Sequence, residues 1–240
     1  SRMPSPPSPA RPTPATRSWI LILDFGSQFT QLIARRIREL HVYSEIHPGD
    51  LSIEEIRAFE PSGIVLSGGP ASVLEEGSPD VDPGVFELGV PVLGICYGLQ
   101  LLVLRLGGRV EASEDREYGR AHLKIERDDP LLQGLSHEVD HVVWMSHGDR
   151  VLSLPAGFDV VASSGHSPFA AVRNADARIW GLQFHPEVAH TDGGRQILEN
   201  FVYRICGCEP EWTMAAFIDE SVEAIRAQVG DGHVICGLSG

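Results

Sequence analysis

The sequence predicts an α/β fold of three layers, in which a mostly parallel open sheet is flanked by helices and extended by an antiparallel strand region. Three observations predict it. Between residues 18 and 108, short apolar runs alternate with amphipathic stretches, which is the pattern of a parallel sheet built from βα units. Between 109 and 180 the apolar runs are shorter and alternate, as in antiparallel strands. A last apolar run, 179–184, is expected to return into the main sheet.

The parallel half begins with Trp19–Leu23, a continuous apolar run of the kind found in strands buried on both faces. Thr30–Leu40 follows, with its apolar residues on one side, and is predicted to be an amphipathic helix. The remaining elements of this half are expected to be strands at 42–46, 63–66 and 90–93, and helices at 53–59 and 99–106. Gly107 and Gly108 end the last of these helices.

The antiparallel half is expected to hold strands at 121–125, 138–144, 159–162 and 169–172, and a helix from 193 to about 205 follows the returning strand. Residues 1–17 contain six prolines and three arginines but no acidic residue, and they are predicted to be a disordered tail. These features divide the chain into the tail 1–17, a domain at 18–208, and a segment at 209–240 that includes a predicted helix at 217–229.

Composition excludes several classes of function. The formal net charge of −14 over 240 residues argues against a general nucleic-acid or anionic-membrane binder. No run approaches the roughly 20 apolar residues of a membrane span. The four cysteines, Cys96, Cys206, Cys208 and Cys236, do not resemble a disulfide framework or a metal site, so we expect no bound metal and a reducing, cytoplasmic location.

Cys96 lies on a predicted strand-to-helix turn. The pattern Gly94-Ile95-Cys96-Tyr97-Gly98 is that of a nucleophile elbow with sulfur in place of oxygen. The flanking glycines allow a strained, sharp turn, and the start of the following helix favours a thiolate. An inert buried cysteine is the alternative, so the assignment depends on partners elsewhere in the chain.

A base and an orienting carboxylate are found together at the end of the returning strand. His185 and Glu187 are two residues apart in Gln183-Phe184-His185-Pro186-Glu187, so an extended backbone places them on the same side. A thiolate nucleophile needs such a base, and the base needs an orienting partner. At the end of another strand, Gly68-Gly69-Pro70 offers backbone N–H groups, which together with the N–H of Tyr97 would make an oxyanion hole.

Three motifs together resemble the class I (triad) glutamine amidotransferases: Gly94–Gln100, Leu66–Pro70 and Gln183–Glu187. The resemblance covers about residues 18–208. Asp24–Gln28, Tyr118–Gly119 and Trp144–Asp149 are similar to stretches of one branch of the family, in which an ATP pyrophosphatase domain follows the amidotransferase domain.

The resemblance implies that L-glutamine is the substrate and that this domain needs no cofactor. Cys96 would attack the side-chain amide carbon while the N–H groups of Gly69 and Tyr97 hold the oxyanion. His185 would protonate the leaving ammonia and then activate water, and Glu187 would orient His185. The amino-acid end of glutamine would be held by Gln100 and by the backbone around Ser146, His147, Gly148 and Asp149.

The end of the sequence resembles the start of that pyrophosphatase domain. Gly232–Gly240 is similar to its opening strand and pyrophosphate loop, and Ser239 and Gly240 would belong to the ATP site. In the intact branch member, ATP and Mg²⁺ adenylate XMP, ammonia converts it to GMP, and the enzyme is a homodimer. Because the loop is incomplete here, we expect residues 209–240 to be mobile or docked in a non-native way and ATP to bind poorly.

Three alternatives remain open on the sequence alone. The chain could be a triad amidotransferase that serves another pathway, although the partial pyrophosphate loop argues against it. It could be a non-catalytic module of the same fold, which the presence of Cys96, His185 and Glu187 disfavours. It could also be a hydrolase that acts on γ-glutamyl peptides with the same triad.

Overall fold

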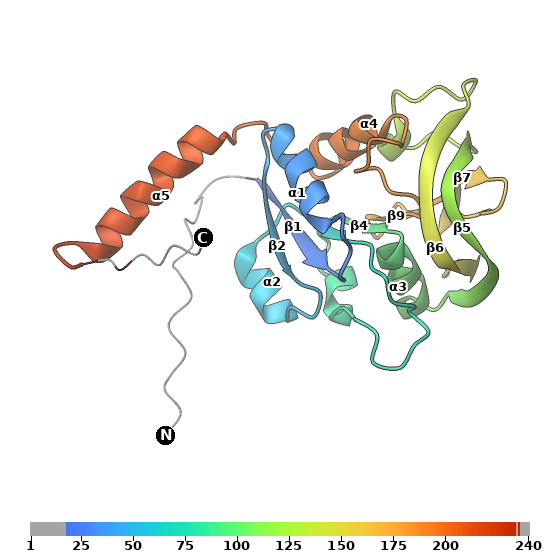
Figure 1. Cartoon of the computed structure of the whole chain (residues 1–240), viewed down its shortest axis with the longest axis horizontal. Helices are drawn as coiled ribbons and strands as arrows, with labels where there is room; N and C mark the ends of the chain where they lie inside the picture. The colour runs from blue at the N-terminus through green and yellow to red at the C-terminus, as the bar shows by residue number, and fades with distance from the viewer. Residues whose placement is uncertain (1–17, 234, 236–240) are drawn as a thin grey trace.

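The computed structural model describes residues 18–233 and 235, and in this range nine strands form one sheet (Figure 1). The strand order is β2-β1-β3-β4-β9-β8-β7-β5-β6. The first five strands are mutually parallel: β2 (Tyr43–Pro48), β1 (Trp19–Asp24), β3 (Gly63–Leu66), β4 (Val92–Ile95) and β9 (Ile179–Leu182). The other four are antiparallel to their neighbours: β8 (Ala171–Asn174), β7 (Asp159–Ser164), β5 (Arg109–Ile125) and β6 (His141–Ser153).

The predicted fold class is confirmed, including the return of β9 into the parallel half beside β4. The lengths predicted for two antiparallel strands were wrong. β5 has 17 residues and begins at Arg109, well before the predicted 121–125, and β6 extends to Ser153 instead of ending at 144. Both strands form a ribbon in which buried residues alternate with less buried ones along β6. Such alternation interrupts an apolar run, so a search for apolar runs finds only part of each strand.

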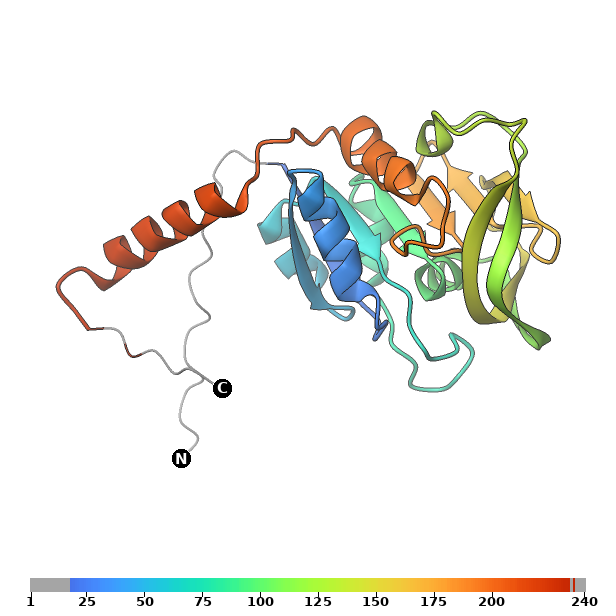
Figure 2. The ribbon, with the colours of Figure 1, turned by 45° about the horizontal axis from the view of Figure 1, so that its top comes forward.

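Helices cover both faces of the sheet (Figure 2). α1 (Thr30–Glu39) and α4 (Gly194–Glu199) pack on one face, whereas α2 (Ile53–Phe59), the 3₁₀ turn η1 (Pro83–Glu87) and α3 (Tyr97–Arg105) pack on the other. β1 contributes alternate residues to the two resulting cores, with Ile20 and Ile22 on the α1 side and Leu21 and Leu23 on the α3 side. The sheet therefore forms the middle layer of three.

The helix predicted over 193–205 is divided in two. α4 ends at Glu199 and continues as a π-helical turn, η3 (Asn200–Ile205). The amide of Asn200 donates hydrogen bonds to the carbonyls of Leu131 (2.9 Å) and Gln133 (2.8 Å), next to the 3₁₀ turn η2 (Pro130–Leu132). This buried side chain therefore joins the helix to the long connection between β5 and β6.

The segment after η3 is attached to the β2 edge of the sheet. Trp212 is buried, and its backbone N–H donates to the carbonyl of His41 at 2.8 Å. Phe217 stacks on Tyr43 with 5.4 Å between ring centroids. α5 (Met214–Val229) begins three residues before the predicted Phe217, because the hydroxyl of Thr213 accepts a hydrogen bond from the N–H of Ala216 and so caps the helix there.

Beyond this attachment, α5 projects from the body of the protein and has no buried residue (Figures 1 and 2). Ser239, Gly240 and the tail 1–17 lie outside the described residues, so the expectations for them stay predictions. Among the described residues, no helix is long and apolar enough to cross a membrane. The described part of the chain also contains no group of three or more His, Cys, Asp and Glu side chains placed to hold a metal ion.

Candidate active site

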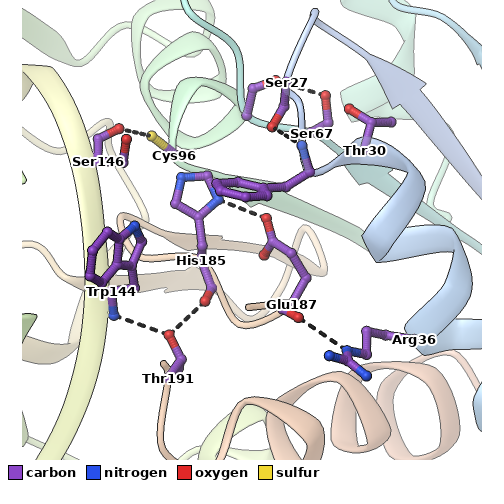
Figure 3. A network of polar contacts seen from close by, with 12 residues as sticks. Ser27, Thr30, Arg36, Ser67, Cys96, Trp144, Ser146, His185, Glu187 and Thr191 are labelled. Carbon is purple, nitrogen blue, oxygen red and sulfur yellow. Dashed lines mark hydrogen bonds and ion pairs between the residues drawn. The ribbon is translucent and has the colours of Figure 1, made fainter. Parts of the chain in front are cut away.

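The predicted catalytic residues and the loop that holds Gly69 follow the carboxyl ends of neighbouring parallel strands. Ser67–Gly69 follows β3, Cys96 follows β4, and His185 comes shortly after β9. Because the parallel strands β3, β4 and β9 are neighbours, these residues meet at one edge of the sheet. Figure 3 shows the result, with His185 lying between Cys96 and Glu187.

Cys96 has the strained backbone that the elbow pattern predicts. Its φ of 51° and ψ of −105° are unusual for a residue with a side chain. The conformation is held from both sides, since Cys96 N–H donates to the carbonyl of Leu182 (2.7 Å) and its carbonyl accepts from the N–H of Gln100 (3.1 Å). At Gly98 a Cβ atom would come within 2.4 Å of the Leu66 carbonyl oxygen, so the helix packs this closely on β3 only with glycine there.

His185 forms a hydrogen bond with Glu187 in the interior of the protein. Nδ1 of His185 lies 2.7 Å from Oε1 of Glu187, and the two residues are 4% and 1% exposed. Burial by itself lowers the pKa of His185. Hydrogen bonds to Cys96 and Glu187, together with the negative charges of both, outweigh this effect and raise the pKa to about 10. At neutral pH His185 is therefore an imidazolium beside the Cys96 sulfur, with Nδ1–H donated to Glu187.

Two further residues hold the His185–Glu187 loop in place. The hydroxyl of Thr191 donates to the carbonyl of His185 (2.6 Å) and accepts from the N–H of Trp144 on β6 (3.0 Å). Nε of Arg36 on α1 donates to the backbone carbonyl of Glu187 (3.1 Å). All three hydrogen bonds appear in Figure 3. Neither residue was predicted from the sequence, because nothing in the pattern near Thr191 or Arg36 indicates these partners.

The raised pKa of His185 predicts that stability falls as pH rises. The folded protein keeps a proton on His185 that the unfolded chain releases above pH 6.5, so this contribution is complete below 6.5 and is lost as pH rises toward about 10. We expect the urea midpoint to fall more between pH 6.5 and about 10 in the wild type than in His185→Gln. Equal pH dependence in the two proteins would contradict the assignment.

The oxyanion donors predicted at Gly69 and Tyr97 belong to residues close to Cys96. Gly69 lines the same cavity as Cys96, and Tyr97 is the first residue of α3. Within the described residues, no hydrogen bond from the N–H of Gly69 or of Tyr97 to another residue is seen. At Gly69 a Cβ atom would lie 2.3 Å from the carbonyl oxygen of Phe25, so only glycine fits there. Two backbone donors are thus available near the sulfur.

A cavity of about 600 Å³ opens over Cys96. All the residues predicted to hold the amino-acid end of glutamine line it: Gln100, Ser146, His147, Gly148 and Asp149. The Cys96 sulfur lies 3.2 Å from the carbonyl oxygen of Ser146. Glu75 and Asp149 give this lining two carboxylates, and no lysine or arginine is among the described residues that form it. A cavity of this charge favours a ligand with a cationic group.

Asp149 is held in place by several contacts. Its backbone carbonyl accepts hydrogen bonds from the Gln100 amide (2.9 Å) and from Nδ1 of His147 (2.8 Å). Its carboxylate accepts one from the hydroxyl of Ser72, at 2.5 Å. Nε2 of His147 lies 3.1 Å from a carboxylate oxygen of Glu117. Gln100 and His147 therefore position Asp149, and Ser72 and Glu117 are members of the site that the sequence pattern does not reveal.

The cysteines outside the site are in a different environment. Burial raises the pKa of the Cys206 thiol well above its usual value, and it raises the pKa of Cys208 to about 11. Cys206 lies against Gly63, at the opposite end of β3 from the cavity. Both remain protonated thiols at neutral pH, so among Cys96, Cys206 and Cys208 the first is the one suited to act as a nucleophile.

Comparison with known proteins agrees with this geometry. The model of the family described as "Glutamine amidotransferase class-I" matches residues 21–205. The chain belongs to the class-I glutamine amidotransferases. Among curated relatives, it is 56% identical over 221 residues to the GMP synthase [glutamine-hydrolyzing] of Staphylococcus carnosus. That alignment spans 92% of this chain but 42% of the relative, so this amidotransferase chain covers less than half the length of that protein.

Solved structures of other amidotransferases are similar as well. A Thermoplasma acidophilum protein, described as one subunit of a GMP synthase, is 32% identical with a TM-score of 0.72, over 80% of this chain and 95% of its own. A glutamine amidotransferase from Methylobacillus flagellatus has a TM-score of 0.57 over 93% of this chain and 99% of its own. Because this second protein is only 20% identical, its similarity supports the fold of this chain and nothing more.

Proposed function

We propose that this chain is the glutamine-hydrolysing part of a GMP synthase, and that Cys96, His185 and Glu187 form its catalytic triad. One observation carries the proposal. In a chain of the class-I amidotransferase family, a strained, buried cysteine lines a cavity and lies beside a histidine that is hydrogen-bonded to a buried glutamate. This arrangement matches the nucleophile, base and orienting acid required for acyl transfer from an amide.

The first half of the reaction forms a thioester. The Cys96 thiolate attacks the side-chain amide carbon of glutamine, and the π electrons of the carbonyl move to oxygen, where the N–H groups of Gly69 and Tyr97 stabilise the charge. When the tetrahedral intermediate collapses, the C–N bond breaks and His185 gives its proton to the departing nitrogen. Ammonia leaves, and a γ-glutamyl thioester remains on Cys96. The raised pKa keeps His185 protonated for this step.

The second half releases glutamate. His185, now neutral, takes a proton from a water molecule whose oxygen attacks the thioester carbon. The same N–H groups hold the second oxyanion, and its collapse expels the Cys96 thiolate. His185 is again an imidazolium. Glu187 keeps Nδ1–H of His185 bonded throughout, so Nε2 is the nitrogen that exchanges protons.

Asp149 is the residue suited to bind the α-ammonium group of glutamine. Its carboxylate faces a cavity whose only other carboxylate among the described lining residues is that of Glu75. Its backbone is fixed by Gln100 and His147, so the charge is preorganised. In this proposal, Gln100 acts through Asp149, because its amide is already engaged with the Asp149 carbonyl and lies 3.4 Å from the Gln183 amide oxygen.

The released ammonia would be used by a second domain of a longer enzyme. The GMP synthase relatives are more than twice as long as the matched region. We propose that ammonia passes from this chain to an ATP pyrophosphatase domain, which uses ATP and Mg²⁺ to adenylate XMP, and that ammonia then displaces AMP to give GMP. A homodimer of the whole enzyme and a part for Ser239 and Gly240 in ATP binding are further elements of this proposal.

Selective labelling of Cys96 tests the proposed function. A glutamine-analogue electrophile, 6-diazo-5-oxo-L-norleucine, is expected to alkylate Cys96 much faster than Cys206 or Cys208, because burial keeps the last two protonated. L-Glutamine should slow the labelling, whereas L-asparagine, one methylene shorter, should not. Peptide mass spectrometry identifies the modified residue. Labelling of Cys96 that L-glutamine does not slow, or no ammonia release from L-glutamine by the wild type, would refute the proposal.

A further inference from the structure

A buried serine lies directly behind the predicted oxyanion hole. Ser67 follows the last residue of β3 and is 0% exposed. Its hydroxyl oxygen accepts a hydrogen bond from the N–H of Phe25, at 2.9 Å, and lies 2.8 Å from the carbonyl oxygen of Gly68. Because Phe25 supplies the proton of the first bond, the single proton of the hydroxyl is donated to Gly68. Ser67 is among the residues drawn in Figure 3.

The bond to Gly68 fixes a second group as well. The carbonyl of Gly68 and the N–H of Gly69 belong to one planar trans peptide, in which they point in opposite directions. Holding the carbonyl toward Ser67 therefore directs the N–H of Gly69 away from Ser67. Gly69 lines the cavity over Cys96, and its own N–H is bonded to no other described residue. The orientation of this donor thus depends on the hydroxyl of Ser67.

A glycine pair needs such a restraint. Glycine has no Cβ to limit its backbone, so the peptide between Gly68 and Gly69 rotates more easily than one between larger residues. A larger residue does not fit at Gly69, where a Cβ atom would lie 2.3 Å from the Phe25 carbonyl oxygen. At Gly68 a Cβ atom would lie 3.0 Å from Cε1 of His185 and would press on that ring. The site therefore keeps its glycines and obtains its rigidity from a neighbouring side chain.

We propose that Ser67 is a positioning residue, which holds the N–H of Gly69 in the orientation that stabilises the oxyanion. This inference rests on the proposed function, because it assigns a purpose to the same site. Ser67 does not touch the substrate; it acts through the Gly68–Gly69 peptide. Its loss should therefore affect the transition state of amide attack and leave the binding of ground-state glutamine largely unchanged.

The test compares three variants. Ser67→Ala removes the hydroxyl, and Ser67→Thr keeps it as a rescue. Ser44→Ala is the matched control, because Ser44 is also 0% exposed and its hydroxyl also donates to a backbone carbonyl, that of Ala34 at 3.2 Å, far from the cavity. Urea unfolding of each variant records the stability cost separately. If Ser67→Ala does not fold, Ser67→Cys, which has similar volume and a weaker donor, takes its place.

Three measurements distinguish positioning from general support. The first is kcat and KM for ammonia release from L-glutamine. The second is the inhibition constant of L-glutamate γ-semialdehyde, whose aldehyde carbon forms a bond to the Cys96 sulfur while its oxygen becomes the hemithioacetal oxygen in the oxyanion hole. The third is the rate of Cys96 alkylation by iodoacetamide, in which sulfur displaces iodide and no oxyanion forms.

For Ser67→Ala we expect kcat to fall by about tenfold or more, since loss of a whole oxyanion donor costs about 10²–10³. The inhibition constant of the semialdehyde should rise by a similar factor, while KM and the alkylation rate stay within about threefold. Ser67→Thr and Ser44→Ala should retain kcat. An unchanged kcat in Ser67→Ala, or an alkylation rate that falls as much as kcat, would overturn the role of Ser67 but leave the proposed function intact. A wild type that releases no ammonia from L-glutamine would instead refute the proposed function.

Discussion

Replacing Cys96 with alanine is expected to reduce glutamine hydrolysis by about 10⁴-fold or more, because removal of the nucleophile from a triad that acts as a unit removes nearly all of its rate enhancement. The fold should remain, since the side chain that is removed is small. Ammonia release from L-glutamine measures the first effect, and circular dichroism with urea unfolding measures the second. In a longer enzyme that also contains the proposed pyrophosphatase domain, GMP synthesis from free ammonium should survive the substitution.

Cys206→Ala is the matched control for this experiment. It removes a thiol that lies near Gly63, at the opposite end of β3, and hydrolysis should stay within about twofold of the wild type. Glutamine-dependent synthesis that persists in Cys96→Ala would show that the nucleophile is another residue.

Loss of His185 should cost more activity than loss of Glu187. In the proposed mechanism, His185 moves the protons of both half-reactions, whereas Glu187 orients it through the 2.7 Å hydrogen bond between Nδ1 and Oε1. General acid–base groups contribute about 10²–10⁴-fold, so His185→Ala should fall in that range and Glu187→Ala should retain more. The double variant should be little worse than His185→Ala, because the two residues act together. Measuring kcat for L-glutamine in each variant checks the ranking.

His190→Ala controls for general disturbance of this loop. His190 is exposed, three residues after Glu187, and it contacts the ring of Trp144 at 5.2 Å between centroids. The substitution should leave kcat within about threefold of the wild type. If Glu187→Ala were less active than His185→Ala, the roles assigned to the two residues would have to be exchanged.

Most of the parallel half could be predicted from the sequence because its signals are local. A strand buried on both faces is a short apolar run, and the predicted bounds of β3 (63–66) and α2 (53–59) coincide with the observed ones. Cys96 and His185 were recognisable because each lies in a short motif at a strand end. In both cases the relevant neighbours are within a few residues along the chain.

The remainder of the site depends on contacts between distant segments. Ser72 meets Asp149 across 77 positions, and Arg36 meets Glu187 across 151. A serine or an arginine is common at a surface, so neither position is distinctive until the fold brings its partner close. The length of β5 was missed for a related reason. The polar residues in its first part are held as a strand by pairing with β6, which is distant in the sequence.

The loop after His185 also closes an open side of the sheet. β6 is an edge strand, paired with β5 on one side only. On its other side, Trp144 exchanges hydrogen bonds with His185 and Thr191, and Val142 does so with Asp192. An uncovered edge of this kind invites pairing with another molecule. The segment from His185 to Asp192 therefore covers the free edge of β6 and shields it from such pairing.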